Sequence, residues 1–208
     1  WEDRLKPGEK LRVDNGGVDM RPGQIETPKW RWKLLVHPDG MISDPLRFHL
    51  TQGKHRLWMG YVSEPMAIKA IRIVSPQSIP AYDELKSNYG LRGYEKTKGL
   101  FIKVQAEDTY YKTDPTVRRE YGADPLSEPY SEDGSRLNNL GGWRWRRANQ
   151  QVAWKFYVPK SGLYKIGIKA YQDRRMPSSR LIKIDGQVPC RELKSFKFPY
   201  NKRWQILM

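Results

Sequence analysis

Two strand-like runs joined by four turn-forming residues constrain the fold of this chain more than any other feature. Apolar and basic residues alternate along the second run, Leu163–Tyr171, and the first run is Gln151–Val158. A period of two is typical of a strand with one buried and one solvated face. The connection Pro159–Gly162 has the length and composition of a hairpin turn. The sequence therefore predicts an antiparallel β-hairpin whose core side chains are Tyr164, Ile166 and Ile168.

Further short runs with strand character follow one another along the chain, at a spacing of about ten residues. They are Trp30–Val36, Leu46–Leu50, Lys54–Val62, Met66–Val74, Leu100–Ala106 and Arg180–Ile184. One segment, Ala81–Tyr89, has helical spacing and is followed by Gly90 as a plausible stop. The predicted fold class is all-β, an antiparallel β-sandwich or jelly roll with one short helix in the connecting segment.

Breaks in this pattern divide the chain into three predicted parts. Residues 1–75 form one part of a β-sandwich, residues 76–99 form a linker with the short helix, and residues 100–208 form a second sandwich part. Two arrangements remain open. The outer parts are the closing half of one sandwich and the opening half of the next, or they complete a single jelly roll together. The abrupt close of the chain within a strand-like run favours a fragment of a longer protein.

The positive charge is concentrated in the last third of the chain. From Leu137 onward there are 16 Lys and Arg against 3 acidic residues, a net charge of +13 out of +15 for the whole chain. Such a region predicts an anionic partner, namely an acidic polysaccharide, a cell-wall polymer, a lipid headgroup or a nucleic acid. A solvated, solubilising strand face is the alternative. No apolar run is long enough to span a bilayer, so no membrane span is predicted in this chain.

Aromatic, guanidinium and amide side chains gather directly after the Gly141-Gly142 pair. Sugar binding uses flat aromatic faces against the apolar side of a pyranose, and amide or guanidinium donors for hydroxyl and carboxylate groups. The long polar segment Glu107–Arg136 lies just before this cluster and is predicted to be a functional loop or disordered. Core packing is the alternative role for the two tryptophans. The candidate ligand-binding residues are Trp143, Arg144, Trp145, Arg147, Asn149 and Tyr130.

Catalysis has little support in the sequence. The chain has three histidines, none of them near a nucleophile motif, and no G-x-S-x-G sequence. A glycosidase needs two carboxylates across the sugar, and the region after Leu137 is poor in acidic residues. The single cysteine, Cys190, excludes an internal disulfide and a Cys/His zinc site. We therefore expect a protein that is not an enzyme.

Four phrases carry a resemblance to known proteins. Val104-Gln105-Ala106-Glu107, the Gly-Gly-Trp at 141–143, Trp154-x-Phe-x-Val-Pro-x-x-Gly-Leu-Tyr and Ile184-Asp185-Gly186 occur in this order. The chain resembles galactose-binding-like jelly-roll carbohydrate-binding modules. More closely, it resembles the β-sandwich regions of large extracellular substrate-binding proteins of carbohydrate ABC transporters in Gram-positive bacteria.

This resemblance implies a function, a location and a metal. It implies an extracellular or cell-surface module that binds carbohydrate, or supports its binding, during the capture and uptake of polysaccharides or oligosaccharides. It also implies that Glu107 is a ligand of a structural calcium ion, which Asp108 and Asp185 would share. Which glycan is bound stays open.

Two alternative functions remain. Interleaved tryptophan and arginine residues in Trp143–Arg147 can stack on bases and neutralise phosphates, which would make the chain a basic nucleic-acid-binding β domain. No recognised nucleic-acid motif is present, which disfavours this hypothesis. The other alternative is an ancillary domain of a polysaccharide lyase or glycoside hydrolase, which differs only in the protein that carries it.

Overall fold

The computed structural model describes residues 1–5, 9–37, 44–76 and 78–208. The chain forms two compact units, one made of residues 1–28 with 80–208 and the other of residues 29–79. These units cut across the predicted parts 1–75, 76–99 and 100–208. The pairing of those parts as sandwich halves stays a prediction.

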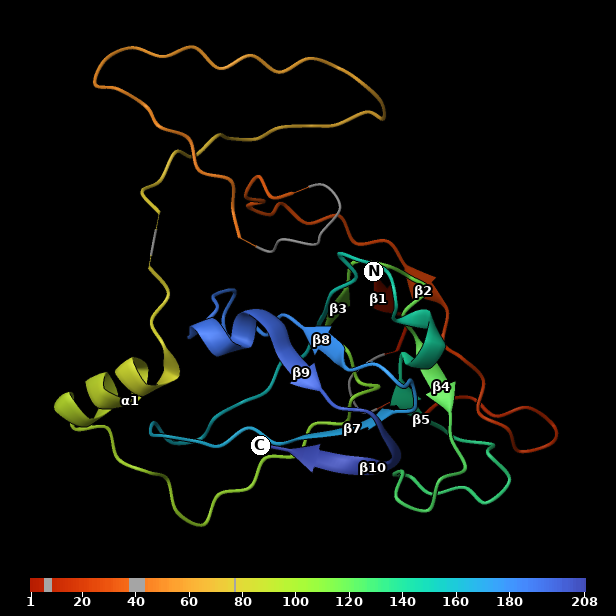
Figure 1. Ribbon diagram of the computed structural model, residues 1–208. Coiled ribbons are helices and arrows are strands. Elements are labelled where there is room, and N and C mark those ends of the chain that lie inside the picture. The colour runs from red at the N-terminus through yellow and green to blue at the C-terminus, as the bar shows by residue number, and fades with distance from the viewer. Residues whose placement is uncertain (6–8, 38–43, 77) are drawn as a thin grey trace. The chain divides into compact units, whose positions relative to one another are not determined.

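The larger unit contains the helices and strands of the described chain (Figure 1). Strand and bridge residues make up 21% of the described residues and helical residues 9%, which confirms a β-rich fold with little helix. The strands are β1 (Glu2–Asp3), β2 (Gln24–Ile25), β3 (Tyr111–Lys112), β4 (Arg119–Tyr121), β5 (Leu137–Leu140), β6 (Val152–Ala153), β7 (Ile168–Gln172), β8 (Ser178–Arg180), β9 (Phe196–Phe198) and β10 (Asn201–Leu207). The helices are α1 (Tyr82–Leu91) and the 3-10 helices η1 (Gly142–Arg144) and η2 (Arg191–Ser195).

The strands of this unit are joined in antiparallel pairs. The pairs are β1 with β2, β3 with β6, β4 with β5, β7 with β10, and β8 with β9. The longest ladder is β7–β10, in which Leu207 lies opposite Ile168 and Gln205 opposite Ala170 (Figure 1). All of these ladders are two-stranded, so the sandwich or jelly-roll arrangement stays a proposal.

The predicted hairpin between Gln151–Val158 and Leu163–Tyr171 is wrong. Its first run pairs through β6 with β3, and its second run pairs through β7 with β10. The turn before β7 packs elsewhere, because the Leu163 N–H donates to the carbonyl oxygen of Glu95 at 2.8 Å. Among the predicted core residues, Tyr164 and Ile168 are half-buried. Ile166 precedes β7 and is 55% exposed, so it is not a core residue.

The predicted helix is confirmed, with boundaries shifted by one or two residues. Helix α1 begins at Tyr82, whose N–H donates to both carboxylate oxygens of Glu192 at 3.0 and 3.1 Å. It continues through Gly90, the predicted stop, and the left-handed residue that follows it is Gly93, with φ of 67°. Crossing a bilayer takes about 20 residues. No helix in the described part of the chain has the length and apolar character for that.

The smaller unit, residues 29–79, is mostly extended chain. A single bridge joins Val36 to Pro45 within its described residues, next to a hydrogen bond from the Leu46 N–H to the Leu35 carbonyl oxygen at 2.8 Å. The described residues of this unit form no strand, so four predicted strands are wrong: Trp30–Val36, Leu46–Leu50, Lys54–Val62 and Met66–Val74. Alternation alone does not make a strand, because an extended segment needs a partner to satisfy its backbone. The predicted turn at residues 37–40 lies mostly outside the described residues.

The interior of the larger unit is unusually polar. Its fully buried apolar side chains, within the described chain, are Val117, Leu137 and Cys190. The buried polar and charged residues are Asp19, Glu107, Lys112, Arg119, Ser127, Ser131 and Asn138. Buried charges persist only when they are paired and hydrogen-bonded. The packing of this unit therefore depends on how those charges are matched.

Candidate functional site

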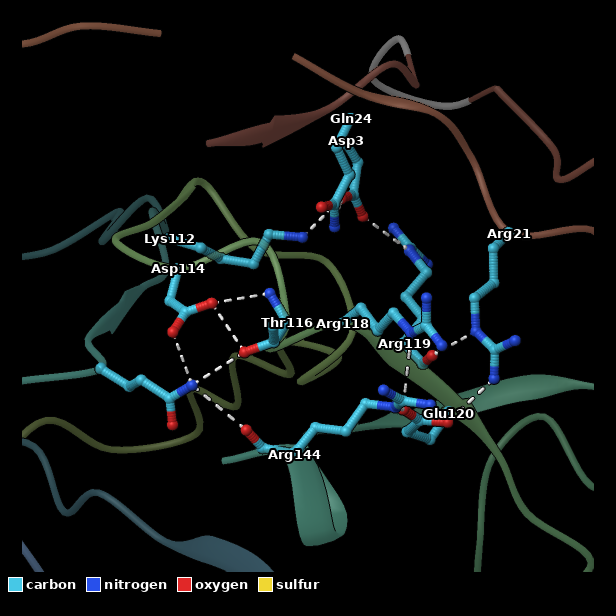
Figure 2. A network of polar contacts seen from close by, with 11 residues as sticks. Asp3, Arg21, Gln24, Lys112, Asp114, Thr116, Arg118, Arg119, Glu120 and Arg144 are labelled. Atoms are coloured by element: carbon cyan, nitrogen blue, oxygen red, sulfur yellow. Dashed lines mark hydrogen bonds and ion pairs between the residues drawn. The ribbon is translucent and has the colours of Figure 1, made fainter. Parts of the chain in front are cut away.

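The segment Glu107–Arg136 is ordered and carries the centre of a charged network (Figure 2). It contains β3 and β4, which belong to two separate two-stranded ladders. Its side chains meet residues from the first 25 positions and from the Gly-Gly-Trp turn. The long polar segment therefore connects the N-terminal residues to the Gly-Gly-Trp turn through its ion pairs and hydrogen bonds.

The buried part of the network is centred on the carboxylate of Asp3. Lys112 Nζ lies 2.5 Å from Asp3 Oδ1, and Arg119 Nε lies 3.2 Å from Asp3 Oδ2. These side chains are 0%, 8% and 9% exposed for Lys112, Arg119 and Asp3. Arg119 also donates through Nη2 to Asp108 Oδ1 at 2.9 Å. A buried pair of this kind adds little net stability, but removal of one partner leaves a charge that water cannot reach.

Three guanidinium groups converge on the carboxylate of Glu120, and we call Arg21, Arg118 and Arg144 the arginine cluster (Figure 2). The shortest distances to a Glu120 oxygen are 2.8 Å from Arg21 Nη2, 3.0 Å from Arg144 Nε and 3.8 Å from Arg118 Nε. Antiparallel pairing of β4 with β5 places Glu120 beside η1, which supplies Arg144. One carboxylate thus faces three cations.

A small hollow opens beside this network. Its volume is about 180 Å³, and its lining residues are Asp3, Arg21, Pro22, Gln24, Arg118 and Arg119. Arg21 is fixed there by two hydrogen bonds, from Nε to the Arg119 carbonyl oxygen at 3.0 Å and from Nη2 to Glu120 at 2.8 Å. Its guanidinium carbon also lies 4.6 Å from the centre of the Tyr121 ring.

The Gly-Gly-Trp turn is held by close packing. Gly141 is buried with φ of 92°, and its N–H donates to the Arg118 carbonyl oxygen at 3.1 Å. A Cβ atom on Gly141 would lie 3.1 Å from Cβ and Cε3 of Trp145. The Trp145 ring packs at 6.4 Å from that of Trp154, and its Nε1 donates to the Gln150 carbonyl oxygen. Trp145 is therefore half-buried and packed against Trp154, and a role for it in ligand binding stays a prediction.

Trp143 is the exposed aromatic residue of the same turn. Its side chain is 59% exposed, and the guanidinium carbons of Arg146 and Arg174 each lie 4.2 Å from its ring centre. We call Trp143, Arg146 and Arg174 the Arg–Trp patch. Cation–π contacts of this length are attractive, and they hold positive charge against a surface aromatic ring.

Arg147 and Asn149 shape the loop that follows η1. The Arg147 N–H donates to Gln150 Oε1 at 2.8 Å, and Asn149 has a left-handed φ of 66°. The Gln150 amide in turn donates to Asp114 Oδ2 at 2.8 Å. A hydrogen bond from the Thr116 side chain, together with that from Gln150, lowers the pKa of Asp114. The loop geometry is thus fixed by a polar side-chain network.

Tyr130 lines a hollow to which the Gly-Gly-Trp turn does not contribute. This open hollow has a volume of about 440 Å³ and is lined by Tyr130, Ser131, Glu132, Asp133, Ser135 and Arg136. Hydrogen bonds from the hydroxyl of Ser131 and from Ser135 lower the pKa of Asp133 to about 2. The structure thus brings the predicted residues 143–149 together on one loop and places Tyr130 with other partners.

The three predicted calcium ligands do not form a group. Glu107 is buried, Asp108 is paired with Arg119, and Asp185 lies in the tight turn between Ile184 and Gln187. No cluster of three or more His, Cys, Asp or Glu side chains occurs in the part of the chain that the structure describes. Calcium binding stays a prediction, which the following experiment tests.

Glu107 makes stability depend on pH. Burial raises its pKa above the usual value of 4.5, so the folded chain holds this proton more tightly than the unfolded chain. The stabilising contribution is complete below that usual value and is lost as the pH rises through the folded-state pKa. We expect Glu107→Gln to melt at a higher temperature than wild type at pH 7, with a smaller difference at pH 4.

Thermal unfolding with and without calcium at both pH values measures this effect. A chelator serves as the control, because a calcium ligand would give the opposite result. If calcium raises the wild-type melting temperature at pH 7 and leaves Glu107→Gln unchanged, Glu107 is a metal ligand.

Several central residues of the network have no local signal in the sequence. Asp3, Arg21 and Lys112 lie in segments that look polar and irregular, and their partners are about 100 residues away. The Arg118-Arg119-Glu120 triplet is the one sequence feature that indicates this network. Adjacent residues of a strand point to opposite faces, so the triplet contributes side chains both to the buried Asp3 pairs and to the arginine cluster.

Comparisons of the chain with protein-family models, with curated proteins and with solved structures found no match.

Proposed function

We propose that this chain is a non-catalytic, extracellular β-rich module that binds acidic carbohydrate, or supports its binding, at a bacterial cell surface. It would act in the capture and uptake of polysaccharides or oligosaccharides. The observation that carries the proposal is the Arg–Trp patch, in which an exposed indole ring lies against two guanidinium groups. The resemblance of the surrounding phrases to carbohydrate-binding sandwiches supports it.

The chemistry of the patch suits a sugar that carries a carboxylate. The apolar C–H face of a pyranose packs on an indole ring, and a guanidinium group binds a carboxylate through two parallel hydrogen bonds. The Arg174 guanidinium group is accessible to a ligand, because its side chain is 62% exposed and its distance to Asp173 is 3.8 Å. A bound uronic acid would thus replace the Arg174 guanidinium group on the indole ring, and the guanidinium group would bind the carboxylate of the sugar.

The surrounding charge favours an acidic polymer. Lys and Arg exceed acidic residues by 13 from Leu137 onward, which raises the local concentration of a polyanion and speeds its association. A neutral glycan would gain nothing from this charge. We therefore propose acidic polysaccharides or cell-wall polymers as the ligand class.

Affinity gel electrophoresis tests the proposal. The full chain should be retarded by polygalacturonate or alginate and much less by neutral glucans. Trp143→Ala should weaken binding by at least about tenfold, the effect expected for a central tryptophan in an interface. Tyr157→Ala is the matched control, since Tyr157 is also exposed, at 80%, and lies outside the patch. Absence of retardation by every polysaccharide would refute the binding function.

Direct comparison at physiological salt separates carbohydrate from nucleic acid, because both polyanions bind a basic surface more weakly as salt is added. Binding to phosphates releases counterions, so the affinity for a single-stranded oligonucleotide should fall steeply with salt. Tighter binding of the oligonucleotide than of any polysaccharide at physiological salt would replace the proposal with the nucleic-acid hypothesis. An ancillary domain of a lyase or hydrolase would give the same binding results as the uptake module.

A further inference from the structure

We propose that the hollow beside the arginine cluster is a binding site for an oxyanion of the carboxylate, sulfate or phosphate class. The hollow is lined by Asp3, Arg21, Pro22, Gln24, Arg118 and Arg119, and none of these residues belongs to the Arg–Trp patch. This site goes beyond the proposed function, because it does not depend on the stacking of a sugar.

The first argument is the balance of charge. The lining contains three arginines and a single carboxylate, that of Asp3. The ion-pair partners of the lining add one cation, Lys112, and two carboxylates, and Arg144 in turn pairs with Glu120, so neutrality is not restored. Among the residues that the structure describes, these ion pairs join Arg21, Lys112, Arg118, Arg119 and Arg144 to Asp3, Asp108 and Glu120. Two positive charges are therefore left over in a region where several of the side chains are largely shielded from water.

The second argument is the state of Arg118. Its Nε atom is buried and donates no hydrogen bond to any described residue. The nearest carboxylate oxygen, Glu120 Oε1, lies 3.8 Å away, which is beyond hydrogen-bond distance. A buried donor without an acceptor is costly, and this cost falls when an acceptor enters. Arg118 is thus the residue that gains most from a bound anion.

The third argument is preorganisation of the other walls. Arg21 is fixed by its two hydrogen bonds, and Arg119 donates to the carboxylates of both Asp3 and Asp108. Gln24 also donates to Asp3, at 3.2 Å. Side chains already held in place lose little entropy when a ligand binds. The volume of about 180 Å³ leaves room for a small oxyanion with some of its water.

Isothermal titration calorimetry on the full chain tests this inference, with sodium phosphate, sodium sulfate and sodium glucuronate at constant ionic strength. We expect saturable one-to-one binding of at least one of these anions. Arg118→Gln should weaken it by at least about tenfold, because a charge-assisted hydrogen bond is lost. Arg203→Gln is the matched control and should bind as wild type does, because Arg203 is exposed and belongs neither to the hollow nor to the Arg–Trp patch. Absence of saturable binding, or equal affinity in Arg118→Gln, would overturn the inference.

Two further variants make the result specific. Arg118→Lys keeps the charge and loses the planar fork, so it should bind with intermediate affinity if the anion is held by Arg118. Trp143→Ala should keep the anion site while losing polysaccharide binding. If Trp143→Ala abolishes anion binding and Arg118→Gln does not, the anion binds at the Arg–Trp patch. The inference then fails and the proposed function stands.

The three anions also identify the ligand group. Binding of glucuronate alone indicates a carboxylate, such as that of a uronic acid. Binding of phosphate and sulfate indicates a tetrahedral anion. Each of these results supports the site, provided that Arg118→Gln reduces it. Circular dichroism of each variant without anion confirms that the loss of affinity does not come from unfolding.

Discussion

Replacing Asp3 by alanine is expected to lower the free energy of unfolding by about 3–5 kcal/mol. The substitution leaves the ammonium group of Lys112 and the guanidinium group of Arg119 without their shared carboxylate, at 0% and 8% exposure. Lys112 cannot reach water without displacing its surroundings, and Arg119 is exposed only where it lines the hollow, so most of the cost is that of an uncompensated buried charge. Urea unfolding followed by circular dichroism and tryptophan fluorescence measures the loss.

Lys112→Met provides the second edge of a double-mutant cycle. It removes one of the two cations and leaves Asp3 paired with Arg119, so its own loss should be smaller. The double variant should lose clearly less than the sum, since both substitutions remove the same contact. Asp173→Ala is the control for an exposed pair with Arg174 and should change stability by less than about 0.5 kcal/mol. An Asp3→Ala loss of the same small size would show that the network is solvated.

Gly141→Ala should cost about 2 kcal/mol or more and should also disturb the site. The backbone at Gly141 has φ of 92°, where a side chain is strained, and the new methyl group would lie 3.1 Å from Trp145. Relief of this contact moves Trp145 away from Trp154 and shifts η1, which carries Arg144. Urea unfolding should show the lower stability, and the tryptophan emission should shift to longer wavelength.

Gly142→Ala separates strain from contact. Gly142 also has a positive φ, of 48°, but a methyl group there meets no atom within 4 Å. Its loss of stability should therefore be smaller, about 1 kcal/mol. Equal losses in the two variants would mean that the approach of Gly141 to Trp145 contributes nothing.

Features set by neighbouring residues are the ones that sequence reasoning predicts well. Helix α1 was expected at Ala81–Tyr89 and is found at Tyr82–Leu91, because helical periodicity is a local property. The β-rich class follows from frequent short alternating runs. The strand pairing could not be predicted, because a turn signal gives no information on the partner. The partner of β7 is β10, which comes about 30 residues later.

In the candidate site, too, local features were predictable from the sequence and long-range contacts were not. The Gly-Gly-Trp turn was predicted as a site, and its exposed Trp143 supports the proposed function. Trp145, two residues further on, has a packing role that only the three-dimensional contacts reveal. The ion pairs of Asp3 reach 109 and 116 residues along the chain, to Lys112 and Arg119. The net charge of the sequence includes these residues but does not indicate that they form ion pairs with one another.

This separation in sequence bears on how the chain folds during its own synthesis. A ribosome adds about 5–20 residues per second, so residue 3 leaves it many seconds before residue 119 does. Strand β1 can pair early with β2, but the carboxylate of Asp3 stays in water until β3 and β4 emerge. The polar interior is therefore closed late, and the N-terminal segment has to remain available without aggregating. Its charged composition, with few apolar side chains, favours its solubility until β3 and β4 have been synthesised.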